Sequence, residues 1–189
     1  MSCKSLILVA PLALLSCSAF AQDQAPADTS EFHKALDLKP NLDNGREIYR
    51  SCATCHGPEG WGRPGGEYPV IAGQLRHVII KQLIDIREGN RGNPMMLPFT
   101  DTRTLRSAQD IADVAEYIAQ LPMTNQNETG PGFDLEHGKQ LYQNNCVDCH
   151  GDRAEGDEKK AIPLLYGQHF GYLVRQFHWI QVGRRKNAD

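Results

Sequence analysis

Two short runs of cysteine and histidine carry the residue types of this chain that are best suited to chemistry. Cys-Ala-Thr-Cys-His occupies residues 52–56, and Cys-Val-Asp-Cys-His occupies residues 146–150. Positions i, i+3 and i+4 of a helix share one face, so two thiols can add to the two vinyl groups of one porphyrin while the adjacent imidazole reaches the iron. Each run is the attachment signature of a c-type haem. The spacing predicts two covalently bound haems, with His56 and His150 as proximal iron ligands.

Other uses of paired cysteines fit the sequence less well. Cysteine pairs that share one zinc ion usually lie roughly 15–20 residues apart, whereas 94 residues separate Cys52 from Cys146. A thioredoxin-like redox pair requires a strand-to-helix setting, and neither run has one. Two structural disulfides would leave both histidines unexplained. Haem attachment therefore remains the preferred interpretation.

The N-terminal residues 1–21 have the pattern of a signal peptide. Lys4 supplies the positive charge, residues 6–15 are apolar, and Ala-Phe-Ala at 19–21 is a cleavage site. The apolar run is shorter than the about 20 residues that a bilayer span needs. The residues before Cys17 loosely resemble a lipoprotein signal, although simple cleavage fits better. We expect a periplasmic protein that meets a membrane only through an acylated Cys17 or through a partner.

From residue 42 onward the chain repeats itself. Residues 42–49 return at 135–142 with an offset of 93, and residues 68–74 return at 162–168 with an offset of 94. One extra residue before the second haem run, Asn144 or Asn145, accounts for the change of offset. The expected organisation is a signal peptide (1–21), a polar, loosely held N-terminal arm (22–40), a first haem domain (41–122), a linker (123–134) and a second haem domain (135–189).

Hydrophobic periodicity predicts three helices in the first unit. One opens with Asn44 as cap and Glu47 as the acid three residues later, and it carries the first haem run. The second covers residues 74–88, with Leu75, Val78, Ile79, Leu83 and Ile86 on one face. The third covers residues 107–121, with Ser107 as its cap. A unit of this size buries little by itself, so the haem is expected to supply much of the core.

A loop between the second and third expected helices carries a possible sixth iron ligand. Asn-Pro-Met-Met-Leu-Pro at 93–98 places two thioethers on an irregular stretch. A soft sulfur ligand favours ferrous iron and raises the haem potential. We predict that Met96 is the distal ligand, with Met95 as the alternative. The predicted haem-binding residues are Cys52, Cys55, His56, Met96, Cys146, Cys149 and His150.

These features resemble the class I c-type cytochromes and, in two-unit form, the dihaem cytochrome c4 kind. The resemblance covers residues 41–189 and rests on both haem runs, Gly45 and Tyr49 of the first helix, the methionine loop and the closing helix. It implies an all-α fold of two tandem class I cytochrome c domains. It also implies that Tyr49 and Tyr117 mark the packing of the first helix on the last.

The second unit departs from this pattern at its end. At the offset of 94, Met96 would correspond to position 190 and the closing helix to 201–215, beyond the printed sequence. We therefore expect a second domain that lacks its last helix and its distal methionine, because the natural protein is longer or because the second iron is ligated differently. A longer natural protein is the favoured explanation. His169 and His178 are the alternative ligands for that iron.

The leading function that this resemblance implies is a carrier of single electrons between a quinol-oxidising complex and a terminal oxidase or reductase. The alternatives are the cytochrome subunit of a periplasmic dehydrogenase complex, and a haem enzyme or gas sensor with an open second iron. A formal net charge of −3 argues against a nucleic-acid partner. Basic residues at 159–160 and 184–186 indicate a solvated face or a docking site for an acidic redox protein.

Overall fold

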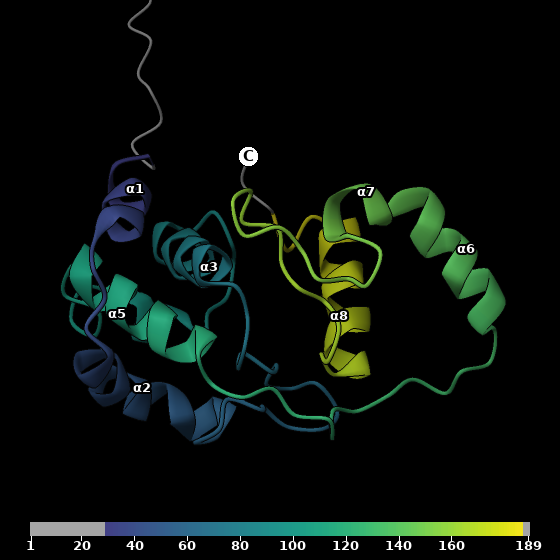
Figure 1. The fold of residues 1–189 in the computed structure, drawn as a ribbon, viewed down its shortest axis with the longest axis horizontal. Helices are drawn as coiled ribbons and strands as arrows, with labels where there is room; N and C mark the ends of the chain where they lie inside the picture. The colour runs from purple at the N-terminus through teal and green to yellow at the C-terminus, as the bar shows by residue number, and fades with distance from the viewer. Residues whose placement is uncertain (1–28, 187–189) are drawn as a thin grey trace, which may run out of the picture.

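The structure, a computed structural model, describes residues 29–186, so the predicted signal peptide lies outside the described residues. Within that range the chain forms helices joined by turns and loops, with one isolated bridge between Asp157 and Ile162. The predicted all-α fold is confirmed. In Figure 1 one group of helices contains α1, α2, α3 and α5, and a second group contains α6, α7 and α8. The helices are α1 (Thr29–Asp37), α2 (Leu42–His56), α3 (Arg76–Glu88), α4 (Leu97–Thr100), α5 (Ala108–Ala119), α6 (Leu135–Asn145), α7 (Val147–His150) and α8 (Phe170–Gln181).

Helix α5 is the centre of the first unit, where it contacts α1, α2 and α3. It begins as predicted, because the Ser107 side chain accepts a hydrogen bond from the Asp110 N–H. Its apolar face is buried, and Ile111, Val114 and Ala115 are among its most deeply buried members. This helix therefore supplies the packed surface on which the haem-bearing helix α2 rests.

Close contact between α2 and α5 depends on Gly45. A methyl group added there would lie 2.8 Å from the Asp113 carbonyl carbon and 2.9 Å from the Tyr117 Cβ. The rings of Tyr49 and Tyr117 pack one turn further along, with centroids 5.3 Å apart. The packing that the resemblance implied for these two tyrosines is therefore present.

We expect Gly45→Ala to destabilise the first unit by about 1–3 kcal/mol, because overpacking forces two backbones apart. The matched control is Gly138→Ala on α6, the counterpart of Gly45 in the repeat, where an added methyl group meets nothing within 4 Å. That change should stabilise α6 by about 0.5–1 kcal/mol, the usual gain from replacing a helical glycine. Denaturant unfolding of the haem-loaded variants measures both effects, and equal effects at the two sites would contradict the close approach.

Helix α3 ends as predicted at Gly89, which adopts the left-handed conformation with φ 80°. Its buried face is broader than predicted. Ile80 and Ile84 are almost wholly buried, whereas Leu83 is only half-buried. The reason is that α3 packs on α1 and α5 on one side and meets the second unit on the other.

Two predictions about the N-terminal part of the first unit are wrong. The cap of α2 is Asn41, whose side chain accepts hydrogen bonds from the Asp43 and Asn44 N–H groups. The Asn44 side chain instead donates to Asp110 and Asp113 of α5, at 3.1 and 2.8 Å. It therefore joins two helices rather than opening one.

The second error concerns the polar arm at 22–40, which is not loosely held from residue 29 onward. Helix α1 buries Ala35 completely against the core. The Arg76 guanidinium donates to the Ala35 carbonyl oxygen at 2.7 Å, and Arg87 forms an ion pair with Glu31 at 2.6 Å. Tertiary contacts therefore hold this short helix in place.

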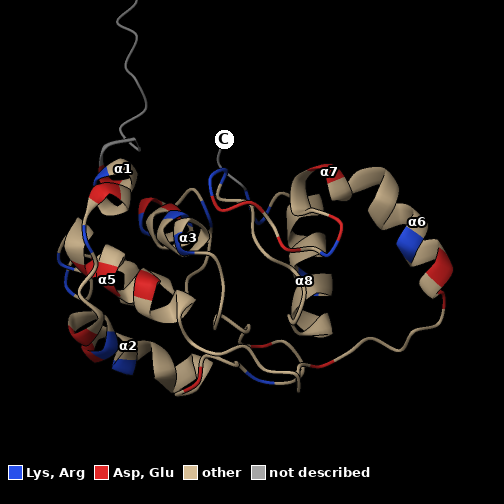
Figure 2. Ribbon diagram, in the orientation of Figure 1, with Lys and Arg blue, Asp and Glu red and all other residues tan. Residues whose placement is uncertain are grey.

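The second unit repeats the first unit's elements with less cover. Helices α6 and α7 bury no residue, and α8 buries only Gln176. Val174 is 50% exposed, although its counterpart Ile80 is fully buried. Figure 2 shows how little charge α8 carries, and Arg175 is its one Lys, Arg, Asp or Glu residue.

The extra residue of the second repeat interrupts its haem-bearing helix. The first unit has one continuous helix, α2, whereas α6 ends at Asn145 and α7 begins at Val147. Cys146 lies at the break with φ −125°. One inserted residue turns the following helix face by about 100°, and the break lets the second haem run keep its orientation.

Candidate haem sites

The last turn of α2 presents the first haem run. Cys52 and Cys55 are free thiols, and His56 is only 5% exposed. The His56 Nδ1 lies 3.0 Å from the Pro69 carbonyl oxygen. Because a carbonyl can only accept, Nδ1 carries the proton and Nε2 keeps its lone pair for a metal. Burial lowers the pKa of His56, and this favours the neutral form that binds iron.

The second haem run has the same local geometry. The His150 Nδ1 lies 2.9 Å from the carbonyl oxygen of Pro163, the counterpart of Pro69. The Tyr142 hydroxyl donates to the Gly151 carbonyl at 2.6 Å. Cys146 and Cys149 are also free thiols. Both units therefore hold two thiols and a backbone-oriented imidazole on adjacent turns.

Matching loops follow both haem runs. In the first, the Gly62 N–H donates to the His56 carbonyl at 2.8 Å, and in the second Gly156 donates to His150 at 2.8 Å. In each unit the turn between this histidine and this glycine contains a residue in the left-handed conformation. That residue is Gly60 (φ 75°) in the first unit and Ala154 (φ 61°) in the second. Residues 57–66, which are rich in Gly and Pro, form turns and irregular loop rather than helix.

The methionine loop places its two thioethers differently. Met95 is 60% exposed, whereas Met96 is half-buried at the start of α4. The Met96 N–H donates to the Asn93 carbonyl at 3.1 Å, which fixes the backbone of the loop. Of the two, Met96 is the one held against the protein.

His169, one alternative ligand for the second iron, is already engaged elsewhere. Its side chain is 2% exposed, its Nδ1 accepts from the Glu128 N–H at 3.0 Å, and its Nε2 lies 2.9 Å from the Trp61 carbonyl oxygen. One ring nitrogen is therefore bound to the linker and the other to the first unit. The idea that His169 ligates the second iron is wrong for this structure, and His178 is exposed on α8.

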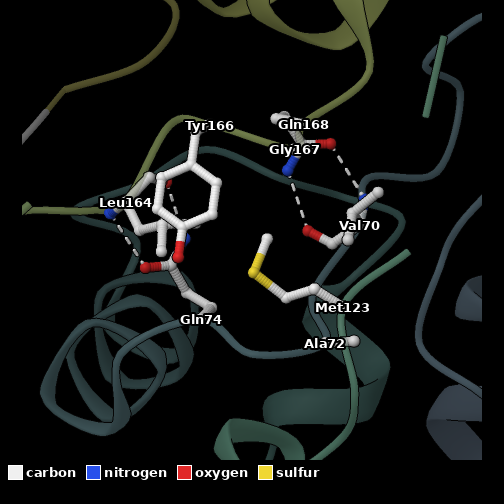
Figure 3. Close-up of a pocket in the computed structure, with 8 residues that line it drawn as sticks. All are labelled: Val70, Ala72, Gln74, Met123, Leu164, Tyr166, Gly167 and Gln168. Carbon is white, nitrogen blue, oxygen red and sulfur yellow. Dashed lines mark hydrogen bonds between the residues drawn. The ribbon is translucent and has the colours of Figure 1, made fainter. Parts of the chain in front are cut away.

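A pair of glutamines that belongs to no haem motif joins the two units (Figure 3). The Gln74 amide accepts from the Leu164 N–H and donates to the Leu164 carbonyl, both at 3.0 Å. The Gln168 amide binds Val70 in the same way, at 2.9 and 2.8 Å. At the repeat offset of 94 each pair maps onto the other, so the contact is pseudo-two-fold. The sequence repeat places the two glutamines at matching positions, and this match was the one feature of the sequence that could have pointed to their role.

Met123 lies between the two glutamine contacts in Figure 3. It packs against Gly73 and against Gly167, the counterpart of Gly73 in the repeat, where an added methyl group would lie 2.7 Å from the Met123 Cε. Both glycines have a left-handed φ, of 69° and 71°. The first residue of the linker therefore fills the centre of the pseudo-two-fold contact.

A second reciprocal cluster contains Arg91 and Arg185. Arg91 contacts Gln82 of its own unit, and across the interface it donates to Gln176 at 3.3 Å and to the Tyr172 hydroxyl at 3.0 Å. Arg185 donates to Gln176 at 2.7 Å and to Gln82 at 3.4 Å. The expectation that Arg185 belongs to a solvated basic face is wrong.

This arginine cluster fits an anionic group. Burial and the like charge of Arg91 lower the pKa of Arg185 to about 10. Both guanidinium groups donate to neutral oxygens, and the Arg185 Nε and the Gln176 Nε2 are buried without a hydrogen-bond partner. Buried charges are costly unless they are paired, and a haem propionate has the charge and acceptor atoms to pair with them. Together with the thiols and the imidazoles, these donors show that the residues present fit two haem groups.

Comparison with known proteins agrees with this geometry. The cytochrome c family model matches residues 42–122 and 135–177. The chain is 32% identical over 142 residues to cytochrome c4 of Pseudomonas aeruginosa (72% of this chain, 69% of that protein) and 33% identical over 153 residues to cytochrome c4 of Azotobacter vinelandii (72% and 70%). It is 29% identical over 170 residues to the thiosulfate dehydrogenase electron acceptor of Stutzerimonas stutzeri (80% and 77%).

Solved structures give the same result. Reduced cytochrome c4 from Pseudomonas stutzeri matches with a TM-score of 0.69 and 25% identity, over 79% of this chain and 84% of that one. Thiosulfate dehydrogenase from Marichromatium purpuratum matches with a TM-score of 0.68 and 26% identity, over 78% and 34%. An all-α fold with paired thiols and a histidine that is hydrogen-bonded to a proline carbonyl defines a class I cytochrome c haem domain. The chain belongs to the cytochrome c family, as a dihaem electron carrier of the cytochrome c4 kind with two covalently bound c haems.

Proposed function

We propose that this protein is a periplasmic carrier that takes single electrons from a quinol-oxidising complex and delivers them to a terminal oxidase or reductase. The main supporting observation is the reciprocal glutamine contact, which joins the two backbone segments whose proline carbonyls bind His56 and His150. No helix among residues 29–186 has the length and apolar character needed to cross a bilayer. The predicted export signal supports the periplasmic location.

We propose the following roles for the side chains at each haem. The thiols of Cys52, Cys55, Cys146 and Cys149 form the thioether links. When bound, each haem supplies an iron that cycles between the ferric and ferrous states. His56 and His150 bind the irons through Nε2, because their Nδ1 protons are held by proline carbonyls. Met96 supplies the sixth ligand of the first iron, consistent with its partial burial.

A second candidate function is the cytochrome subunit of a periplasmic dehydrogenase complex. The relatives named as thiosulfate dehydrogenase electron acceptors favour it. The two functions differ in the partner that reduces the haems. A free carrier accepts electrons from a membrane complex, whereas a subunit accepts them from a catalytic protein that binds it stably.

The haem-loaded protein distinguishes the two functions in a single assay. It is mixed either with membranes that contain a quinol-oxidising complex and quinol, or with a purified thiosulfate dehydrogenase and thiosulfate, and haem reduction is followed in the visible spectrum. The carrier function predicts reduction by the membranes and reoxidation by membranes that contain a terminal oxidase. Reduction by the dehydrogenase alone, with co-elution of the two proteins, would favour the subunit function and contradict the carrier.

A further inference from the structure

We propose that each haem is tuned from the opposite domain: Gln168 adjusts the potential of the first haem and Gln74 adjusts that of the second. The inference goes beyond the carrier function, and it does not depend on which proteins donate or accept the electrons. It requires only the two haem sites and the contacts between the two domains.

The first connection runs through one peptide group. The carbonyl oxygen of Pro69 accepts the His56 Nδ1 proton, with 3.0 Å between the atoms. The N–H of that same peptide group belongs to Val70, and it donates to the Gln168 Oε1 at 2.9 Å. Val70 is 5% exposed, so water has little access to this contact. A continuous hydrogen-bonded chain therefore runs from the imidazole of the first domain to the amide of the second.

The second connection is the counterpart of the first. The Pro163 carbonyl accepts from the His150 Nδ1 at 2.9 Å, and the Leu164 N–H of that peptide group donates to the Gln74 Oε1 at 3.0 Å. Each glutamine also donates to the carbonyl oxygen of the residue whose N–H it accepts from. This second bond sets which end of the amide faces the N–H. The acceptor oxygen is thereby fixed against the peptide group that holds the histidine.

The electronic effect has a definite direction. An N–H group that donates a hydrogen bond polarises its peptide, and its carbonyl oxygen becomes a better acceptor, by about 10–30% per bond in a chain. A stronger acceptor at Nδ1 gives the imidazole more anionic character and makes it a stronger donor to the iron. Stronger donation favours the ferric state. Each glutamine therefore lowers the potential of the haem in the other domain.

The test uses Gln168→Met and Gln74→Met in the haem-loaded chain. Methionine keeps the side-chain length and removes both hydrogen bonds. The readouts are the potential of each haem, followed through its own NMR signals during a redox titration, and the chemical shifts of the two histidine Nδ1 protons in the reduced protein. Gln168→Met should raise the potential of the haem on Cys52 and Cys55 and shift the His56 proton upfield. Gln74→Met should do the same to the other haem and to His150.

The crossed pattern separates tuning from a merely structural role. If both haems shift equally in each variant, or if each glutamine affects the haem of its own domain, the proposal is overturned. The neutral control is Tyr172→Phe, which removes the hydroxyl that Arg91 contacts across the interface but leaves both peptide groups intact. It should move neither histidine proton. A shift of both protons in this control would attribute the effect to general loosening of the interface.

A further variant reverses the sign. Gln168→Glu keeps an acceptor for the Val70 N–H and makes it anionic, so the potential of the first haem should fall below that of the parent protein. This variant also decides the question if Gln168→Met does not fold. A rise in the first potential, or a larger fall at the second haem than at the first, would contradict the proposed connection.

Discussion

Replacing Met96 with alanine should lower the potential of the first haem and open its sixth coordination position. The expected fall is on the order of 0.1–0.3 V, a part of the about 0.8 V over which axial ligands set haem potentials. The physical reason is the loss of a soft sulfur ligand that stabilises ferrous iron. Potentiometric titration measures the shift, and binding of carbon monoxide to the reduced variant measures the open position.

Met95→Ala is the matched control for this substitution. The two residues are adjacent and chemically identical, but Met95 is 60% exposed and Met96 is half-buried. Met95→Ala should leave the potential nearly unchanged and should keep the weak ferric charge-transfer band that a thioether ligand produces. If Met95→Ala abolishes that band while Met96→Ala retains it, the ligand assignment is reversed.

Removing the second haem should unfold the helices that carry it, whereas removing the first should leave a folded core. The variants are Cys146→Ala with Cys149→Ala, and Cys52→Ala with Cys55→Ala. Helices α6 and α7 bury no residue in the protein fold, so the haem is their main apolar partner. The first unit has its own cluster, which includes Ile80, Ile84 and Ile111.

Hydrogen exchange and intact mass test this difference together. Each double variant should lose the mass of one haem. Amide protection along α6 should vanish in the variant without the second haem, while α3 and α5 should stay protected in the variant without the first. Full protection of α6 in the absence of its haem would show that this helix is stabilised in another way.

The prediction of the haem residues rests on chemistry that depends on short spacing. Thiols and an imidazole within five residues specify a haem attachment whatever the rest of the fold does. The C-terminus of α3 and the N-terminus of α5 were predictable for the same reason, since Gly89 and the Ser107 side chain each act within a single helical turn. Where the cause lies within one turn of the chain, the sequence was sufficient.

The errors arose where distant parts of the chain decide the outcome. Asn41 and Asn44 are both suitable caps, and Asn44 is withdrawn from that role by Asp110 and Asp113 of another helix. The short helix α1 looked like a polar arm because the residues that hold it, such as Arg76, lie 40 residues away in the chain. His169 was a candidate ligand in the sequence, but contacts with Glu128 of the linker and Trp61 of the first unit engage both its ring nitrogens.

The roles of Gln74 and Gln168 also depend on distant parts of the chain. Glutamine has no chemistry that marks it as functional, and the repeat showed only that these two positions correspond. Their role requires that Val70 and Leu164 be brought to them from the opposite unit. Internal symmetry in a sequence is therefore a useful guide to interface residues. In a pseudo-two-fold contact, both members of each pair of matching positions lie in the interface.

A dihaem electron carrier should hold a working redox centre at both haem runs of one chain. Coulometric titration of the purified protein, followed in the visible spectrum, tests it most directly by counting electrons against protein. The expected result is two electrons taken up per chain, with both haems fully reduced and reoxidised over repeated cycles. Uptake of one electron, or of none, would show that at least one of the two sites does not hold a functional haem.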